Sequence, residues 1–212
     1  MTDLAREPVS HRIARRLGAW FSRRSGPWGV FVEGFIRHPR MVGSIIPSSR
    51  FTIRKVLAPV RWDDCKLFVE YGPGVGTFCR PVLAKLRRDA RLIVIDTNPL
   101  YIDYLNATIS DGRFTAVHGS ATDVEAIIAA HGHEKADYIL SGLPFSTLPE
   151  GVGPAIAAAT HRALRPGGAF LVYQFTPAAK HFMRRHFARI DSGFEWLNIM
   201  PSFLYWGWKQ DD

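Results

Sequence analysis

Short apolar runs alternate with segments of helical spacing from residue 66 to residue 175. The runs are rich in Val, Ile, Leu and Phe, as strands buried on both faces of a sheet are. The predicted strands are 66–71, 92–96, 113–118, 137–141 and 168–175. The predicted helices between them are 77–87, 99–109, 123–130 and 152–164. This alternation predicts an α/β fold, a parallel sheet with helices on both faces.

The segments on either side of this alternation predict a closing hairpin and a set of N-terminal helices. Pro166-Gly167-Gly168 predicts a turn into the fifth strand, and a helix over 177–187 is followed by strands Arg189–Leu197 and Ser202–Trp208. Together these make seven strands. The helices predicted on the N-terminal side are 3–24, Trp28–Ile36 and Phe51–Leu57, the last capped by Ser48 or Ser49.

The first crossover contains a glycine-rich turn between a strand and a helix. Gly72, Gly74 and Gly76 alternate with other residues directly after the strand, and Glu70 lies two positions before the first glycine. The second strand ends in Asp96, 22 residues beyond Gly74 and in the position where a carboxylate holds ribose hydroxyls. The pattern predicts a nucleotide-type cofactor, and the absence of a G-x-x-x-x-G-K-[ST] motif argues against a phosphate loop.

Charge, cysteine content and hydropathy limit the partners, the cellular compartment and the membrane topology that the protein can have. The 212-residue chain has a formal net charge of +8, and residues 1–40 hold eight arginines against three acidic residues. Such a basic segment favours nucleic acid or an anionic membrane as a partner. Two cysteines predict no disulfide framework and suit a reducing cytoplasm, and no histidine and cysteine spacing indicates a metal site. We expect neither a transmembrane helix nor a secretory signal.

The helix predicted over 3–24 is amphipathic. Ile13, Leu17, Trp20 and Phe21 share one face, and arginines cover the remainder. Two interpretations stay open at this stage: a helix that packs on the domain, and an interfacial helix that binds anionic lipid.

The fourth strand ends in Ser141-Gly142-Leu143-Pro144-Phe145, at the edge of the sheet where the first strand also ends. In amino-methylating enzymes of this architecture the corresponding motif is [NDS]-[LP]-P-[YFW], which holds the acceptor amine. Gly142 stands here without an amide or carboxylate side chain. Such a side chain usually holds the exocyclic amine of a base, so the loop favours another kind of amine.

Three segments together resemble the bacterial phospholipid N-methyltransferases, which are related to the rRNA adenine dimethyltransferases. They are Gly43-Ser44-Ile45-Ile46-Pro47-Ser48-Ser49-Arg50, Val69-Glu70-Tyr71-Gly72-Pro73-Gly74-Val75-Gly76, and the loop from Ser141 to Phe145. The resemblance implies a seven-stranded, Rossmann-like class I methyltransferase sheet with N-terminal helices. It also implies S-adenosylmethionine as methyl donor, S-adenosylhomocysteine as product, and phosphatidylethanolamine and its methylated intermediates as acceptors on the way to phosphatidylcholine.

On this basis we expect basic, membrane-associating helices over 1–40 and the methyltransferase domain over 41–212, on the cytoplasmic face of the membrane. The expected cofactor-binding residues are Glu70, Tyr71, Gly72, Pro73, Gly74, Asp96, Thr97, Ser120, Ala121, Ser141, Ile46 and Ser48. The expected catalytic residues are Tyr173, Ser141, Gly142 and Leu143, with Tyr173 the first candidate to take or relay the proton of the amine. The expected substrate-binding residues are Phe145, Arg50, Lys180, His181, Arg184 and Tyr205.

Two other functions are compatible with the same sequence. An RNA adenine N6-methyltransferase would use the basic segment to bind phosphates. A non-enzymatic, cofactor-binding membrane module would keep the glycine motif without turnover. For the phospholipid enzyme we expect a phospholipid and an anionic membrane surface as partners, and no nucleic acid.

Overall fold

The computed structural model of the protein describes residues 48–198 and 201–210. Its centre is a seven-stranded sheet with the strand order β3-β2-β1-β4-β5-β7-β6. The strands are β1 (Leu67–Tyr71), β2 (Arg91–Asp96), β3 (Phe114–His118), β4 (Ala136–Ser141), β5 (Leu164–Gln174), β6 (Arg189–Glu195) and β7 (Ser202–Trp208). The first five are parallel, and β7 pairs antiparallel with both β5 and β6. The predicted seven-stranded α/β sheet is therefore confirmed.

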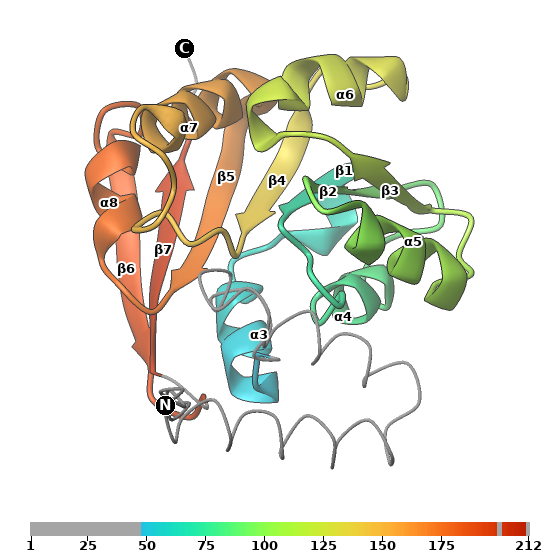
Figure 1. The fold of residues 1–212 in the computed structure, drawn as a ribbon, viewed down its shortest axis with the longest axis horizontal. Helices are drawn as coiled ribbons and strands as arrows, with labels where there is room; N and C mark the ends of the chain where they lie inside the picture. The colour runs from blue at the N-terminus through green and yellow to red at the C-terminus, as the bar shows by residue number, and fades with distance from the viewer. Residues whose placement is uncertain (1–47, 199–200, 211–212) are drawn as a thin grey trace, which may run out of the picture. The chain divides into compact units, whose positions relative to one another are not determined.

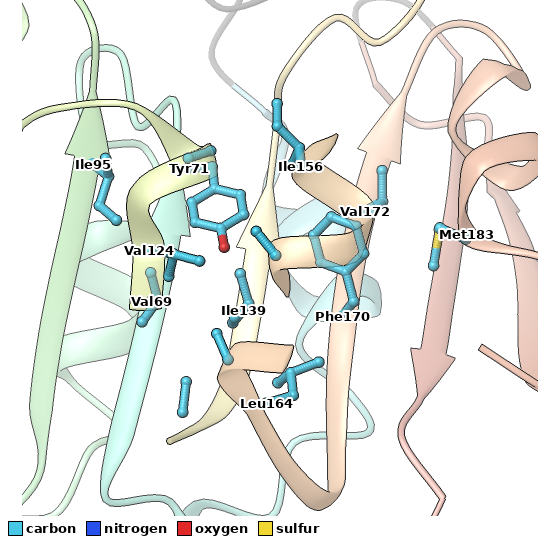
Figure 2. Close-up of a cluster of buried hydrophobic side chains, with 14 of the residues drawn as sticks. Val69, Tyr71, Ile95, Val124, Ile139, Ile156, Leu164, Phe170, Val172 and Met183 are labelled. Carbon is cyan, nitrogen blue, oxygen red and sulfur yellow. The ribbon is translucent and has the colours of Figure 1, made fainter. Parts of the chain in front are cut away.

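Helices lie on both faces of the sheet, as predicted (Figure 1). They are α3 (Arg50–Val56), α4 (Cys79–Leu83), α5 (Pro99–Thr108), α6 (Val124–Ala130), α7 (Val152–Ala163) and α8 (Ala178–Met183). One core cluster joins the sheet to α6, α7 and α8, and the other joins it to α3, α4 and α5. Figure 2 shows the first cluster, which contains Tyr71, Ile139 and Phe170 from three neighbouring strands together with Ile156 of α7. Because successive strand residues point to opposite faces, β1, β2, β4, β5 and β7 supply buried residues to both clusters.

Local chemistry explains two differences from the predicted boundaries. The helix predicted over 77–87 is only Cys79–Leu83, because turns occupy the preceding residues: the Gly76 N–H donates to the Pro73 carbonyl at 2.8 Å. The turn predicted at Pro166-Gly167-Gly168 lies inside β5 as a bulge, where Ala136 pairs with Leu164 but Tyr138 pairs with Ala169. Gly167 accommodates this bulge with φ +68°.

The start of α3 confirms a predicted cap. The Ser49 side chain accepts a hydrogen bond from the Thr52 N–H at 3.2 Å, as a helix N-cap does. The helices predicted over 3–24 and 28–36 lie outside the described residues, so the division into 1–40 and 41–212 stays a prediction. Among the residues that are described, no helix combines the length and hydropathy needed to cross a bilayer.

Candidate cofactor and acceptor site

The glycine turn leaves β1 at the carboxyl edge of the sheet, beside the end of β2. Gly72, Gly74 and Gly76 have φ values of +61°, +53° and +76°, a region that side-chain-bearing residues rarely adopt. The Gly72 N–H donates to the Ile95 carbonyl at 2.9 Å, which ties the turn to β2. The turn thus presents main chain, rather than side chains, next to the carboxylate of Asp96, the residue after Ile95.

Two carboxyl groups lie beside this turn in surroundings that disfavour charge. Glu70 is 1% exposed and accepts a hydrogen bond from the Cys79 thiol at 3.5 Å. Burial, helped by nearby Asp96, raises the pKa of Glu70 to about 8. Burial also raises the pKa of Asp96, although the backbone of Gly74 and Asn98 donates to its carboxylate. A cation at this edge would stabilise both carboxylates.

The ends of β2 and β3 bring other predicted cofactor residues to the same edge. The Gly119 N–H donates to the Asp96 carbonyl at 3.0 Å, and the His118 ring contacts the Thr97 carbonyl at 3.1 Å. Ser120 then caps the following turn by accepting from the Thr122 N–H at 3.2 Å. The structure therefore gathers Asp96 and Thr97, at the end of β2, with Ser120, which lies more than twenty residues later in the sequence, at one site.

The loop after β4 is held rigidly against the glycine turn. Buried Ser141 accepts a hydrogen bond from the Leu143 N–H at 3.2 Å, and the Gly142 N–H donates to the Tyr71 carbonyl at 3.3 Å. The side chain of Leu143 lies so close to Gly72 that a Cβ there would be 2.8 Å from it. Predicted acceptor and cofactor residues are thus in direct contact.

Gln174 braces this loop from the end of β5 and was not predicted from the sequence. Its amide nitrogen donates to the Leu143 carbonyl at 2.6 Å, and its amide oxygen accepts from the Ala179 N–H at 3.0 Å. The only signal in the sequence is its position directly after Tyr173. Gln174 therefore couples the acceptor loop to the start of α8.

Tyr173 lies over the acceptor loop, where the predicted motifs meet. Its ring packs on Phe78 with centroids 4.8 Å apart, and its hydroxyl is hydrogen-bonded to the side chain of Ser48. A Cβ built on Gly142 would lie 2.6 Å from the Tyr173 ring carbon that bears the hydroxyl. Ser48, Gly142 and Tyr173, from three separate segments, therefore surround one position above the sheet edge.

The electrostatics of this position determine what Tyr173 can do. Burial, and then the charge of Glu70, raise the pKa of Tyr173 above its ordinary value. The phenol consequently keeps its proton at physiological pH. It can accept a hydrogen bond and pass a proton on to Ser48, but it does not supply a phenolate base.

Four of the predicted substrate-binding residues are not at this position, and here the prediction needs correction. Tyr173 pairs with Leu204 and Val172 pairs with Tyr205, so Tyr205 faces the opposite side of the sheet. Lys180 lies with Tyr205, 5.8 Å from its ring centre, and donates to Ser192 at 3.0 Å. His181 and Arg184 are exposed residues at and just after α8, on that same side.

The remaining predicted residues divide into core, surface and undescribed positions. Phe145 is buried and packs against Phe170 and Phe182, with centroids 6.5 and 6.1 Å away, so we reassign it to the support of the loop. Arg50 is exposed at the start of α3, with its guanidinium 4.9 Å from the Phe51 ring centre. Ile46 lies outside the described residues.

Comparisons with known proteins agree on a methyltransferase. No family model matches the chain. It is 27% identical over 178 residues to the ornithine lipid N-methyltransferase of Singulisphaera acidiphila, covering 83% of this chain and 93% of that protein. It is 36% identical over 81 residues to the ribosomal RNA small subunit methyltransferase H of Burkholderia ambifaria, covering 38% of this chain and 26% of that protein.

Solved structures show the same fold. The precorrin-6y C5,15-methyltransferase of Geobacter metallireducens has a TM-score of 0.61 at 16% identity, covering 76% of this chain and 89% of that one. The 16S rRNA N2 G1207 methyltransferase of T. thermophilus, solved with AdoMet and guanosine, has a TM-score of 0.54 at 16% identity. That alignment covers 75% of this chain and 42% of that one.

The residues at the sheet edge suit the cofactor that these proteins imply. S-Adenosylmethionine carries a sulfonium, ribose hydroxyls and no phosphate, which suits a glycine turn flanked by the carboxyl groups of Glu70 and Asp96. The chain is therefore an S-adenosylmethionine-dependent methyltransferase with the class I fold, related over most of its length to the lipid N-methyltransferases.

Proposed function

We propose that the protein transfers methyl groups from S-adenosylmethionine to the amine of phosphatidylethanolamine and of its methylated intermediates, towards phosphatidylcholine. The observation that carries this proposal is the close approach of Tyr173, which is hydrogen-bonded to Ser48, to the main chain of Gly142; it leaves no room for an amide or carboxylate side chain at position 142. An adenine amine needs a stacking face and a side chain that accepts from its nitrogen. A small aliphatic amine needs neither.

A second candidate acceptor is the amine of an ornithine lipid. It is favoured by the relative that matches 83% of this chain, whereas the ribosomal RNA methyltransferase of Burkholderia ambifaria matches 38%. Both lipids present a small amine close to a membrane surface. We propose that the protein works as a peripheral protein on the inner face of the cytoplasmic membrane.

We call the position that Ser48, Gly142 and Tyr173 surround the acceptor position. Its residues have two roles in this reaction, to position the amine and to remove its proton. S-Adenosylmethionine, when bound, supplies an electrophilic methyl group, so most of the catalysis is the positioning of the amine. Buried surroundings disfavour the ammonium form of the lipid, which must lose a proton before it can attack. The Tyr173 hydroxyl accepts a hydrogen bond from the amine. As it takes the amine proton it gives its own proton to the Ser48 hydroxyl, and Ser48 in turn releases its proton to solvent water.

Transfer of a labelled methyl group tests the proposed acceptor. Purified protein with labelled S-adenosylmethionine is offered phosphatidylethanolamine micelles, ornithine lipid micelles or ribosomal RNA in separate reactions. We expect label in phosphatidylethanolamine. Label in ornithine lipid alone would show that ornithine lipid, and not phosphatidylethanolamine, is the acceptor. Label in RNA alone would overturn a lipid function. Asp96→Ala is the control, because loss of a hydrogen bond to a charged group weakens cofactor binding by about 1.5–3 kcal/mol.

Binding of the cofactor is expected to release a proton from Glu70. The pKa of Glu70 is raised to about 8 by burial, so near pH 7 the free protein holds this carboxyl group protonated. A bound cation favours the carboxylate and lowers that pKa, so the affinity for S-adenosylmethionine should rise as pH increases towards about 8. Calorimetry in buffers of different ionisation enthalpy measures the released proton.

Glu70→Gln is the matched variant, since it keeps the shape of the side chain and cannot ionise. It should bind without proton release, and release equal to wild type would contradict the assignment. The free protein gives a second readout. A pKa raised from 4.5 means that folding stability falls as pH rises from about 4.5 to about 8, and the variant should lack this fall.

A further inference from the structure

The β6–β7 hairpin exposes large apolar side chains at its tip. Trp196 and Leu197 are 75% and 61% exposed, and Phe51 on α3 is 40% exposed. The fourth large apolar side chain exposed in the described part of the chain is Leu100, which is on α5. We refer to Phe51, Trp196 and Leu197, with Arg50 and Arg54, as the hairpin-tip surface.

Polar groups of the hairpin tip are turned inward and hold its backbone in place. Glu195 accepts from the Leu197 N–H at 2.8 Å and forms an ion pair with Lys55 at 3.6 Å. The Asn198 side chain donates to Ser202 at 3.0 Å and accepts from the Ser49 N–H at 2.9 Å. In an ordinary surface loop the polar side chains face solvent. At this tip the side chains of Glu195 and Asn198 are turned inward and those of Trp196 and Leu197 face solvent, which suits an apolar partner.

Two arginines lie on α3 with Phe51, and the guanidinium of one of them, Arg50, is 4.9 Å from the Phe51 ring centre. Arg50 and Arg54 are exposed on α3, and the described residues offer neither of them an ion pair. The single carboxylate of the tip, Glu195, is paired with Lys55. The hairpin-tip surface therefore combines exposed aromatic and aliphatic side chains with positive charge that no residue in the described part of the chain neutralises, a combination that suits the interface of an anionic bilayer.

The same surface adjoins the acceptor position. Gln174, the last residue of β5, pairs with Phe203, and Glu195 pairs with Ser202, so the tip projects from the carboxyl edge of β5. Asn198 bonds the backbone of Ser49, and the preceding residue, Ser48, is hydrogen-bonded to Tyr173. A lipid whose amine reaches Tyr173 would consequently leave its acyl chains near the hairpin tip.

From this arrangement we infer that the hairpin-tip surface inserts into an anionic lipid bilayer and brings the acceptor position to the headgroups. The choice of a bilayer as the partner rests on the proposed function. Trp196 lies at the headgroup level, Leu197 is buried in the acyl region, and Arg50 and Arg54 bind anionic headgroups.

The test compares full-length wild type with Trp196→Ser/Leu197→Ser and with Leu100→Ser. Co-sedimentation uses phosphatidylcholine vesicles with and without phosphatidylglycerol. We expect the double variant to bind anionic vesicles about tenfold or more weakly, because exposed apolar groups no longer leave water. Leu100→Ser, which removes an equally exposed side chain from another element, should bind as wild type does. The predicted basic N-terminal segment is intact in all three proteins.

Quenching of tryptophan fluorescence by brominated lipid locates the contact directly. Wild type should be quenched by vesicles more strongly than Trp196→Phe, which removes only one indole. Equal quenching of these two proteins, or equal sedimentation of the double variant and Leu100→Ser, would overturn the inference. So would a dimer that depends on Trp196 and forms in place of vesicle binding.

Methylation of a short-chain lipid dissolved below its micelle concentration separates this inference from the proposed function. The double variant should methylate it at the wild-type rate, because it needs no bilayer. If wild type methylates this lipid and the double variant binds vesicles as well as wild type does, only the inference fails. If the tip binds vesicles and no lipid is methylated, only the proposed function fails.

Discussion

Gly142→Ala is expected to lower lipid methylation about 100-fold or more, as a misplacement of about 1 Å at a reacting centre does. The added Cβ would lie 2.6 Å from a ring carbon of Tyr173 and closer still to its hydroxyl. Tyr173 cannot move aside without losing contacts, because its ring packs on Phe78 and its hydroxyl is hydrogen-bonded to Ser48. Either the loop or the tyrosine must shift, and both form the acceptor position.

The affinity for S-adenosylhomocysteine separates this effect from damage to the donor site. The N–H of Gly142 donates to the Tyr71 carbonyl at 3.3 Å, and a Cβ at position 142 would point at Tyr173 rather than at the glycine turn. We therefore expect calorimetry to give near wild-type affinity for the variant, and thermal unfolding to show an overpacking cost of about 1–3 kcal/mol. Wild-type turnover in Gly142→Ala would contradict the proposed role of the close contact between Gly142 and Tyr173.

Tyr173→Phe is the matched control, because it removes the hydroxyl and adds no atom. If the hydroxyl relays the proton, this variant should also lose most of its turnover while retaining wild-type stability and cofactor affinity. A variant with full turnover would limit Tyr173 to a packing role and leave the proton to another group.

The sequence was sufficient to predict the sheet and the edge at which the site lies. Alternation of apolar runs with helical segments indicated the parallel strands, and parallel strands bring their carboxyl ends together. Glu70 and Asp96 could therefore be placed beside one another without knowledge of any distance. The structure confirms the sheet and places both residues at that edge, beside the glycine turn.

The sequence was not sufficient to predict which side chains share a face near the end of β5. Tyr173 and Tyr205 both belong to predicted strands, but the register of β5 against β7 puts them on opposite faces. That register is a long-range property of the pairing of β5 with β7, which no local sequence pattern reveals. The raised pKa of Glu70 could not be predicted from the sequence either, because it depends on the burial of the side chain, which only the packed structure defines.

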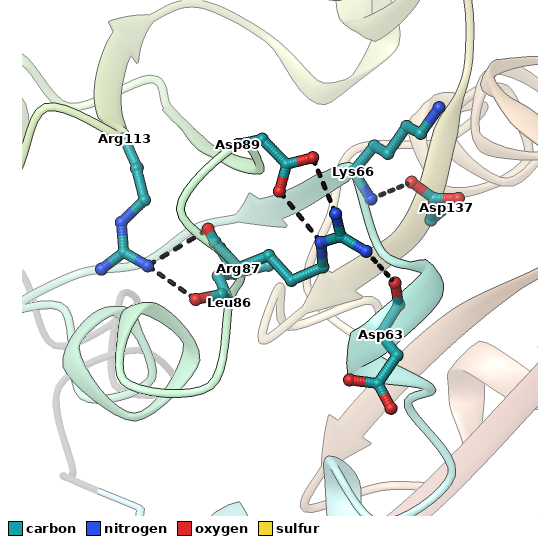
Figure 3. A network of polar contacts seen from close by, with 7 residues as sticks. All are labelled: Asp63, Lys66, Leu86, Arg87, Asp89, Arg113 and Asp137. Atoms are coloured by element: carbon teal, nitrogen blue, oxygen red, sulfur yellow. Dashed lines mark hydrogen bonds and ion pairs between the residues drawn. The ribbon is translucent and has the colours of Figure 1, made fainter.

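Asp137→Ala is expected to cost about 3–5 kcal/mol of folding stability, the typical cost of removing one partner from a buried ion pair. Asp137 is 6% exposed near the amino end of β4. One of its oxygens accepts from the N–H groups of Lys66 and Leu67, both at 2.8 Å, and the other binds Arg165. Figure 3 shows Asp137 beside Lys66 at the start of β1.

The cost is large because several groups lose their partner at once. The backbone N–H groups of Lys66 and Leu67 would lose their acceptor, each at about 1–3 kcal/mol when buried, and Arg165 would lose its counter-charge. In a protein of this size the midpoint of thermal unfolding should fall by about 10 °C. Asp137→Asn, which keeps an acceptor oxygen but no charge, should lose less.

Asp89→Ala provides the matched control within the same network (Figure 3). Asp89 also pairs with an arginine, Arg87, at 2.9 Å, but both side chains are more than half exposed. Water replaces such a pair at little cost, so the loss of folding stability should be much smaller than in Asp137→Ala. Equal losses in Asp89→Ala and Asp137→Ala would show that the buried network contributes no more than a surface pair. Below its unfolding transition Asp137→Ala should still methylate lipid, because the acceptor position lies at the opposite, carboxyl edge of the sheet.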